Sequence, residues 1–323
     1  MSIARIASAF VVSAGLGLGA ACSSALAADM PVKALPPPPA PETLDMHAFF
    51  DVSFKNDYIT PRGLLVTNTG LTTQILAGMA ADVYKDKSGF INLVSFYGYV
   101  WNDLWSKQGD PTAGSWNEFD WAVGMTVKFW QNWKFGIEYV EFISPPGNFR
   151  IERNAEFTLA YDDSGWWGAS GFSVNPYVKL FYNFSGSSTV VVGKTNGAYD
   201  VELGIVPTLD TRKYTGIPLT LLVPTWVTGG PAEYWNAGAN VCGVALCSQD
   251  NAGVFSTGLT GKLALDAWVP ARFGKWYAKG GFQYYHIIND NLLLAQTIVG
   301  TAATFATAHQ DVWVGFGGLG FSF

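Results

Sequence analysis

Residues Trp116–Phe129 read WNEFDWAVGMTVKF, and every second side chain from Phe119 onward is large and apolar. One face carries Phe119, Trp121, Val123, Met125, Val127 and Phe129, and the other carries Glu118, Asp120, Thr126 and Lys128. A helix would mix the two sets because its side chains repeat every 3.6 residues, whereas a strand separates them. The stretch therefore predicts a β-strand with one apolar and one polar face.

The same alternation recurs along the chain. Twelve segments are candidate strands, namely 47–58, 71–84, 90–101, 116–129, 133–143, 149–161, 173–184, 198–208, 217–227, 254–268, 275–288 and 309–323. Most are 11 to 15 residues long, which exceeds the 5 to 6 residues usual in globular sheets and is enough for a tilted membrane strand. They predict an all-β fold, a transmembrane antiparallel up-and-down β-barrel of about 12 strands.

The composition agrees with a membrane barrel. Of the 323 residues, 49% are hydrophobic and only 14% are charged, against roughly 25% charged in a soluble domain. After the N-terminal segment, no apolar run approaches the roughly 20 residues that a membrane helix needs. The formal net charge of -6 is opposite to the positive charge expected of a protein that binds nucleic acid.

Connections and aromatic residues give two further checks. Connections after the second, fourth and tenth strands are short and most of the others are longer, as expected when both termini face the periplasm. Two connections differ, because 144–148 is short on the outer side and 162–172 is long on the inner side. Aromatic side chains predict a periplasmic rim at Trp130, Trp133, Trp166, Trp167, Phe273, Trp276 and Phe323, and an outer rim at Trp101, Trp105 and Trp116.

Prolines and one apolar loop limit the strand count to 12 plus or minus two. Pro176, Pro218 and Pro224 fall inside predicted strands, where each removes a ladder donor and favours a bulge or a strand end. Residues 291–308 are unusually apolar for an outer loop. They could extend the strands, fold inward or form a short helix.

The N-terminus predicts export. Residues 1–27 read as a cleaved signal peptide, with Arg5 as the positive residue, an apolar stretch at 6–21 and the small-residue cleavage site Ala25-Leu26-Ala27. A retained membrane anchor and a lipoprotein attached through Cys22 are alternatives. Residues 28–46 are rich in proline and predict an extended periplasmic spacer, so that 47–323 would form the outer-membrane barrel of a Gram-negative bacterium.

Cleavage would leave two cysteines, Cys242 and Cys247. An even number in an exported protein predicts a disulfide that closes a small loop. A metal pair is the alternative, but neither histidine nor further cysteine lies near them in the sequence. We therefore expect no metal and no cofactor.

The last ten residues, VGFGGLGFSF at 314–323, alternate large apolar side chains and end in phenylalanine. This stretch, with Leu319, Phe321 and Phe323, resembles the C-terminal signal of bacterial outer-membrane proteins. The resemblance implies recognition by the barrel-assembly machinery through the last strand.

A second resemblance concerns the end of the first predicted strand, NDYITPRG at 56–63. The chain resembles a group of porin-like proteobacterial outer-membrane barrels of unassigned function, in which Ser-Asp-Tyr is followed by a two-residue gap and Arg-Gly. Here Asn56 replaces the serine, and three residues precede Arg62. The resemblance implies a barrel in the outer membrane and carries over no catalytic residues.

The polar strand faces predict the lining of the lumen. The candidates are Glu118, Asp120, Lys128, Glu138, Arg150, Glu152, Glu156, Lys179, Asp200, Glu202, Lys262, Asp266 and Lys279, together with the neutral Gln283. A polar, charged lumen inside an apolar band predicts a narrow channel for small hydrophilic solutes. Eight of the charged candidates are acidic and five basic, which predicts a weak cation preference. Charges that pair and fill the lumen would instead give an occluded structural barrel.

The sequence also has features that bear on two other functions. An outer-membrane lipase would need a serine beside a histidine, and His286 and His309 with Asp311 are the nearest candidates for a base and its orienting group. No suitably spaced serine accompanies them, so we expect no enzyme. Surface recognition by residues 228–253, stiffened by the predicted disulfide, is the third hypothesis.

Overall fold

The computed structural model describes residues 44–107, 115–185, 197–235 and 250–323. Within them, twelve antiparallel strands form the wall of a barrel, and three of these strands are interrupted by short breaks. In chain order the wall consists of β1 (Asp45–Lys55), β4 (Thr72–Lys85), β5 (Ile91–Trp105), β6 (Trp116–Phe129), β7 (Trp133–Ile143), β8 (Glu152–Tyr161), β9 (Phe172–Ser173) with β10 (Pro176–Ser185), β11 (Ala198–Ile205) with β12 (Thr208–Asp210), β13 (Leu219–Leu222) with β14 (Thr225–Gly229), β15 (Ala252–Ala264), β16 (Lys275–Ile287) and β17 (Asp311–Ser322).

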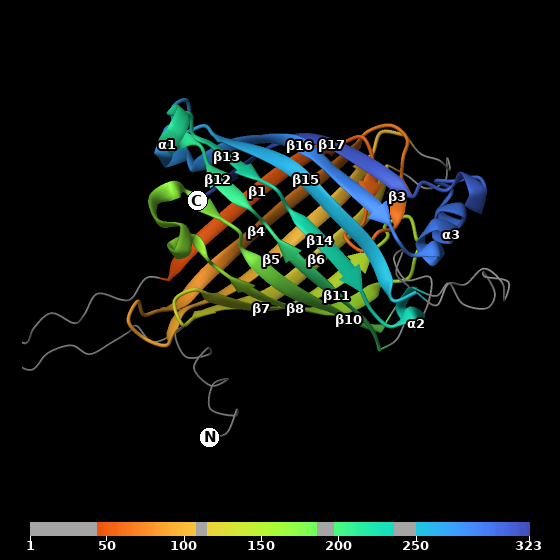
Figure 1. The fold of residues 1–323 in the computed structure, drawn as a ribbon, viewed down its shortest axis with the longest axis horizontal. Coiled ribbons are helices and arrows are strands. Elements are labelled where there is room, and N and C mark those ends of the chain that lie inside the picture. Colours follow the sequence, from red (N-terminus) through yellow and green to blue (C-terminus); the bar gives the residue numbers. More distant parts are fainter. Residues whose placement is uncertain (1–43, 108–114, 186–196, 236–249) are drawn as a thin grey trace, which may run out of the picture. The chain divides into compact units, whose positions relative to one another are not determined.

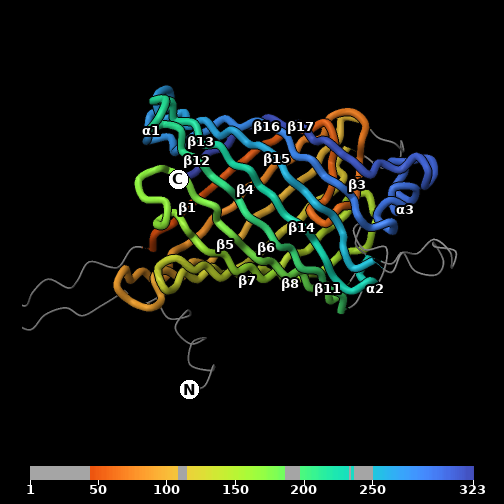
Figure 2. Tube along the Cα trace, in the orientation of Figure 1, coloured from red at the N-terminus to blue at the C-terminus, as the bar shows by residue number. Residues whose placement is uncertain are grey.

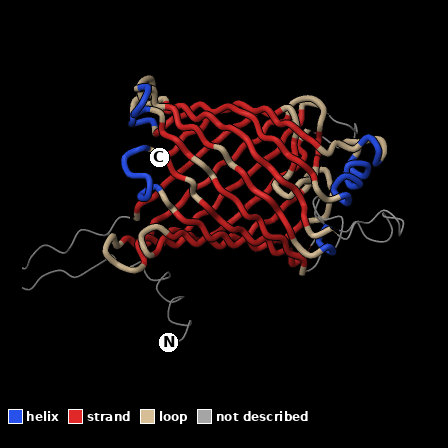
Figure 3. Tube along the Cα trace, in the orientation of Figure 1, coloured by secondary structure: helices blue, strands red, loops and turns tan. Residues whose placement is uncertain are grey.

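The ring of strands is closed (Figure 1). The first strand, β1, pairs with the last, β17, with Phe49 opposite Ser322. On the far side of the ring, β14 pairs with both β11 and β15. Figure 3 shows strands around the whole wall. The predicted closed antiparallel barrel is confirmed, and closure leaves the sheet without a free edge.

The breaks in the wall lie at prolines. Pro176 is the first residue of β10, Pro207 separates β11 from β12, and Pro224 separates β13 from β14. Proline has no N–H to donate, so the ladder is interrupted at each position. The pairing register is nevertheless the same on both sides of each break. Each divided pair is therefore one wall strand, and the disturbances predicted at Pro176, Pro218 and Pro224 are found, with Pro218 just before β13.

The two ends of the barrel carry different connections (Figure 2). The turn end holds the start of β1, the end of β17, and the elements η2 (Ser164–Ser170), α1 (Arg212–Thr215) and η3 (Ala271–Phe273). The loop end holds β2 (Tyr58–Ile59), β3 (Leu65–Thr67), α2 (Ala232–Trp235), α3 (Asp290–Val299) and η4 (Phe305–Thr307). The connection expected to be short at 144–148 runs from 144 to 151 and is the shortest on the loop end. The connection at 162–171 is no exception, because the one after β15, predicted to be short, runs from 265 to 274 and is equally long.

The apolar faces of the strands point away from the lumen. Met79, Phe96, Val123 and Leu203 are all more than half exposed on the outer surface. On β6, the alternate residues Glu118, Asp120 and Ala122 are buried inside. The outer surface therefore carries an apolar band, as a barrel surrounded by lipid requires.

An apolar core occupies the loop end of the lumen. It consists of Tyr58, Ile59, Leu64, Leu65, Val66, Ala198, Tyr234, Trp235, Val254, Ile287, Leu292, Leu293, Ala295, Val312 and Val314. Helix α3 supplies part of it, so two of the three alternatives for residues 291–308 hold together. Asp290–Val299 form a short helix, and this helix folds inward. The Asn289 side chain accepts from the Asn291 N–H at the start of α3, and Gly300 ends it in the left-handed conformation. No helix of the described residues is long and apolar enough to cross a membrane.

The first strand is shorter than predicted, ending at Lys55 rather than at 58. The cause is Asn56, whose amide Nδ2 donates to the Trp313 carbonyl oxygen at 3.1 Å and whose Oδ1 accepts from the Gly315 N–H at 2.7 Å. The side chain thus takes the place of a backbone partner of β17. The chain is released from the wall and turns into the barrel. At the turn end, β15 likewise ends at Ala264 rather than at 268.

Candidate functional site

Residues 56–71 fold back into the lumen as a plug. Its strands β2 and β3 pair with each other and with no wall strand. Leu64 and Leu65 are 0% and 1% exposed and belong to the apolar core with Leu292 of α3. Burying such side chains contributes roughly 1.5–3 kcal/mol each. The plug is therefore held at the loop end by apolar packing.

A tight turn at Thr60–Gly63 forms the tip of the plug. The Gly63 N–H donates to the Thr60 carbonyl oxygen at 2.9 Å, and the Leu64 N–H donates to the Thr60 hydroxyl oxygen at 3.1 Å. Gly63 has a φ of +100°, and a Cβ there would lie 2.9 Å from Cδ1 of Leu292. Only glycine fits this conformation and this space. The turn directs Arg62 into the barrel.

Arg62 is 3% exposed and sits in a nest formed by Phe142, Glu152, Phe181, Asp200 and Tyr234. Its guanidinium carbon lies 5.1 Å from the ring centre of Phe142 and 4.9 Å from that of Phe181. Its Nη1 lies 3.7 Å from Oε1 of Glu152. These five residues, which come from β7, β8, β10, β11 and α2, are called the Arg62 nest below.

The electrostatics of the nest favour a cation. Burial acts against charge on Arg62, but Tyr234, Glu152 and Asp200 outweigh it and raise the pKa of Arg62 above its ordinary value. Glu152 is 0% exposed and accepts a hydrogen bond from the Asn154 amide at 2.9 Å. A buried carboxylate of this kind is stable only beside a positive partner.

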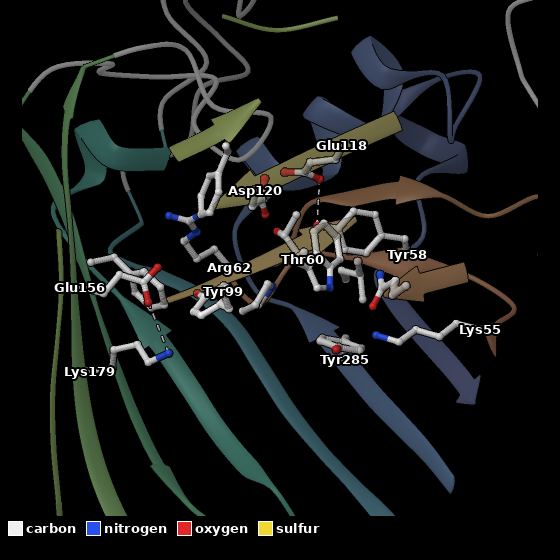
Figure 4. A pocket seen from close by; sticks show the side chains of 16 residues that line it. Lys55, Tyr58, Thr60, Arg62, Tyr99, Glu118, Asp120, Glu156, Lys179 and Tyr285 are labelled. Carbon is white, nitrogen blue, oxygen red and sulfur yellow. Dashed lines mark hydrogen bonds and ion pairs between the residues drawn. The ribbon is translucent and has the colours of Figure 1, made fainter. Parts of the chain in front are cut away.

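A cavity of about 320 Å³ lies beneath the plug and is called the plug chamber. Figure 4 shows the plug residues Tyr58, Thr60 and Arg62 lining it together with wall residues. The Tyr58 hydroxyl donates to Glu118 at 3.1 Å, and Lys179 lies 3.5 Å from Glu156. Aromatic rings and paired charges thus alternate around the cavity. A solute with both polar and apolar faces could make contacts with each.

A second cavity of about 240 Å³ continues toward the turn end and is called the turn-end chamber. Three side chains line both cavities, Tyr99, Glu156 and Lys179. Glu138 lies in the second cavity and accepts from the Tyr99 hydroxyl at 2.7 Å. The lumen is therefore a series of polar spaces that share charged walls.

Eleven of the candidate lumen residues lie in the chambers, in the Arg62 nest or elsewhere on the wall. Four of them, Glu118, Asp120, Glu156 and Lys179, line the plug chamber, and Glu138 lines the turn-end chamber. Glu152 and Asp200 belong to the nest. Glu202 lies elsewhere on the wall and accepts a hydrogen bond from the Tyr177 hydroxyl at 2.7 Å. Lys279 lies 2.6 Å from Asp51, and the Lys262 ammonium lies 3.7 Å from the ring centre of Tyr277. Lys128 lies near the turn end of β6.

Arg150 and Asp266 lie outside the wall. Both are exposed residues of connections, Arg150 before β8 and Asp266 after β15. The alternation of polar and apolar residues continues beyond the end of each strand in the sequence. The predicted strands at these two positions are therefore a few residues longer than the observed ones.

Sequence reasoning missed the residues that decide the shape of the lumen. Arg62 and Tyr58 were noted only as part of a resemblance, and Asp51, Lys55 and Tyr99 were not considered. The available signal was the run Leu64-Leu65-Val66, which is too apolar for a loop in water. Such a run next to Gly63 indicates a segment that packs inside the protein.

The other predicted features are placed as follows. Phe321 stacks on Phe50 at 5.6 Å, while Leu319 and Phe323 are 47% and 60% exposed on the outer surface. Nδ1 of His286 lies 2.8 Å from Asp311, whereas Nε2 of His309 lies 3.3 Å from the Asn68 amide. The cysteines at 242 and 247, the signal segment 1–27 and most of the spacer lie outside the described residues.

One cluster at the turn end has the donor types of a metal site. The potential ligand atoms of Asp45, His47 and Asp82 lie within 4.8 Å of one another. Lys85 contacts both carboxylates there, and His47 lies 3.0 Å from Asp82. Lys85 thus already supplies the positive charge that these acids need.

No family model matches the sequence. No curated protein matches it either. Among solved structures, an outer membrane channel from Pseudomonas putida F1 is 9% identical with a TM-score of 0.49, over 88% of this chain and 97% of that chain. OprB of Pseudomonas putida is 8% identical with a TM-score of 0.38, over 87% of this chain and 94% of that chain. OmpF of Salmonella typhi, in complex with daunomycin, is 9% identical with a TM-score of 0.34, over 87% and 97% respectively.

Proposed function

We propose that this chain is an outer-membrane channel for small hydrophilic solutes, narrowed at its loop end by the plug. The apolar outer band fits a lipid environment, and the polar lumen fits water and solutes. Strand β1 begins and strand β17 ends at the turn end, which would face the periplasm, while the longer connections would face the outside. A cleaved signal peptide and assembly through the C-terminal strand by the barrel-assembly machinery belong to the same proposal.

The observation that carries this proposal is a pair of neighbouring cavities inside the barrel. They hold about 320 and 240 Å³ and share Tyr99, Glu156 and Lys179. A water molecule takes about 30 Å³ in the liquid, so either space is large enough for a small solute. A barrel whose side chains filled its interior completely would leave no cavities of this size.

A weak cation preference is proposed from the distribution of charge. Acidic side chains gather on β6, β7, β8 and β11, where they are Glu118, Asp120, Glu138, Glu152, Glu156, Asp200 and Glu202. Arg62 and Lys179, together with Lys55 in the plug chamber and Lys134 in the turn-end chamber, offset much of this charge. The excess of carboxylates attracts cations and repels anions as they pass.

Planar-bilayer recording of the purified chain tests the proposal. We expect discrete conductance steps and, in a salt gradient, a reversal potential on the cation side. Uptake of a small neutral sugar into proteoliposomes should accompany the steps. A chain that is inserted and folded, yet shows neither steps nor uptake, would contradict the channel. An anion-side reversal potential would contradict the charge preference alone.

An occluded barrel is the second candidate, and the apolar core at the loop end favours it. The buried cluster around Leu64, Leu65 and Leu292 takes up part of that end of the lumen. The two candidates differ in the effect of loosening the plug. A channel conducts before and after the change, whereas an occluded barrel conducts only after it.

A further inference from the structure

Arg62 lies between two aromatic rings that recognise the shape of its side chain. The rings of Phe142 and Phe181 come from β7 and β10, and their centres lie 5.1 and 4.9 Å from the guanidinium carbon. A flat, weakly hydrated cation stacks well between two rings, whereas a compact, strongly hydrated ammonium does not. The nest is therefore shaped for a guanidinium group.

The nest offers more hydrogen-bond acceptors than Arg62 uses. Oε2 of Glu152 is buried without a hydrogen-bond partner, and so is Nε of Arg62 itself. The buried Asp200 carboxylate interacts with Tyr234 but accepts no hydrogen bond from Arg62. The hydrogen bond that Arg62 does make, from Nη1 to the Tyr234 hydroxyl oxygen, is long at 3.4 Å. A guanidinium has five N–H donors in a fixed plane. Because the turn at Gly63 fixes its position, Arg62 does not donate to all of these acceptors.

The nest is open to the lumen on one side. Arg62, Phe142 and Phe181 all line the plug chamber. Glu156 lines the same chamber and contributes to the favourable field at Arg62. A solute in the chamber can thus reach the rings without crossing the barrel wall.

From these contacts we propose that the Arg62 nest is a binding site for small solutes that carry a guanidinium group, with Arg62 as a built-in competitor. The inference rests on the proposed channel, because a solute reaches the nest through the lumen. An untethered guanidinium can move to satisfy Glu152 and Asp200 together. Arg62 is attached to the nest at a high effective concentration, so a free solute binds the native chain more weakly.

Binding to the purified chain in detergent tests the site without any need for current. The probes are ethylguanidinium chloride and ethylammonium chloride, which carry the same charge and the same alkyl group. Titration calorimetry on Arg62→Ala, in which the nest is vacant, should give at least about tenfold tighter binding of ethylguanidinium than of ethylammonium. The native chain should bind ethylguanidinium at least about tenfold more weakly than Arg62→Ala does.

Two further variants locate the site. Adding Glu152→Gln to Arg62→Ala should weaken ethylguanidinium binding by about tenfold or more, because a charged acceptor is lost. Glu141→Gln is the matched control, since Glu141 faces outward and pairs with Arg153 at 2.9 Å. It should leave binding unchanged. If Arg62→Ala does not fold, Arg62→Ala combined with Asp200→Asn serves in its place, because it removes one of the two buried carboxylates left without a cation and keeps Glu152 and the space between the rings.

The outcomes separate this site from the channel itself. Equal affinity for the two cations, equal binding by the native chain and Arg62→Ala, or no effect of Glu152→Gln would each overturn the guanidinium site. A folded barrel that discriminates between the cations but passes no ions would overturn the channel and leave the site intact. A conducting barrel that does not discriminate would overturn the site alone.

Discussion

The two halves of the lumen are built from the same twelve strands yet differ in what fills them. At the loop end, Leu64 and Leu65 of the plug pack with α3, and Arg62 is 3% exposed. Toward the turn end, Lys279 pairs with Asp51 and Lys262 lies over Tyr277, and these groups are in part exposed. The loop end thus resembles the core of a soluble domain, and the turn end resembles a wet pore.

This difference shows that the barrel wall determines the size of the lumen but not which side chains fill each half of it. The sixteen residues of the plug, between β1 and β4, fill part of the loop-end half of the lumen and leave the turn-end half more open. We therefore expect substitutions in the loop-end half to change the free energy of unfolding and the size of the pore. Substitutions in the turn-end half should change mainly ion selectivity.

The largest effect is expected from Glu152→Gln. It removes the carboxylate that lies 3.7 Å from buried Arg62, and breaking a buried ion pair costs about 3–5 kcal/mol. Urea titration in lipid vesicles, followed by tryptophan fluorescence, measures the change. Glu141→Gln, on the outward-facing pair with Arg153, should cost less than about 1 kcal/mol. An equal loss of unfolding free energy in the two variants would show that the Arg62–Glu152 pair is no better shielded from solvent than the pair on the outer surface.

Leu65→Ala should follow in size. Leu65 is 1% exposed within the apolar core, and truncating a buried leucine costs about 2–5 kcal/mol. The matched control is Leu203→Ala on the lipid-facing side, where Leu203 is 55% exposed. Lipid can fill the space in the control, so its loss should be clearly smaller in the same titration. A plug loosened in this way should also conduct more.

Gly63→Ala tests the tip of the plug. The φ of +100° and the 2.9 Å approach to Leu292 predict a loss of about 1–3 kcal/mol from backbone strain. Gly165, at the turn end, has nothing within 4 Å of an added Cβ, so Gly165→Ala should have almost no effect. If Gly63→Ala were as stable as the native chain, the turn that aims Arg62 would be unnecessary.

The smallest change in stability is expected in the turn-end half. Lys279→Met breaks the 2.6 Å pair with Asp51, in which the two side chains are 21% and 15% exposed, and should cost roughly 1 kcal/mol. The loss of a positive charge should shift the reversal potential toward cations, and Asp51→Asn should shift it the opposite way. Shifts in the same direction for both variants would contradict a lumen route past this pair.

The wall could be predicted from sequence because alternation is a local signal. Trp116–Phe129 shows it without interruption, and strand ends marked by Pro176 and Pro224 follow from the missing N–H of proline. The plug could not be predicted in the same way. Asn56 ends β1 through a contact with Gly315 that is 259 positions away, and Arg62 finds its partners on four different strands and a helix. Such contacts depend on the closed ring, which no short stretch encodes.

The central feature of the molecule is a polar lumen that the plug restricts at the loop end. Single-channel recording of the native chain and Arg62→Ala under identical salt tests this most directly. We predict discrete steps from both, with a clearly larger unit conductance in Arg62→Ala because the plug has lost its charged anchor. Identical unit conductance in the two proteins, or a folded Arg62→Ala barrel that stays silent, would contradict it.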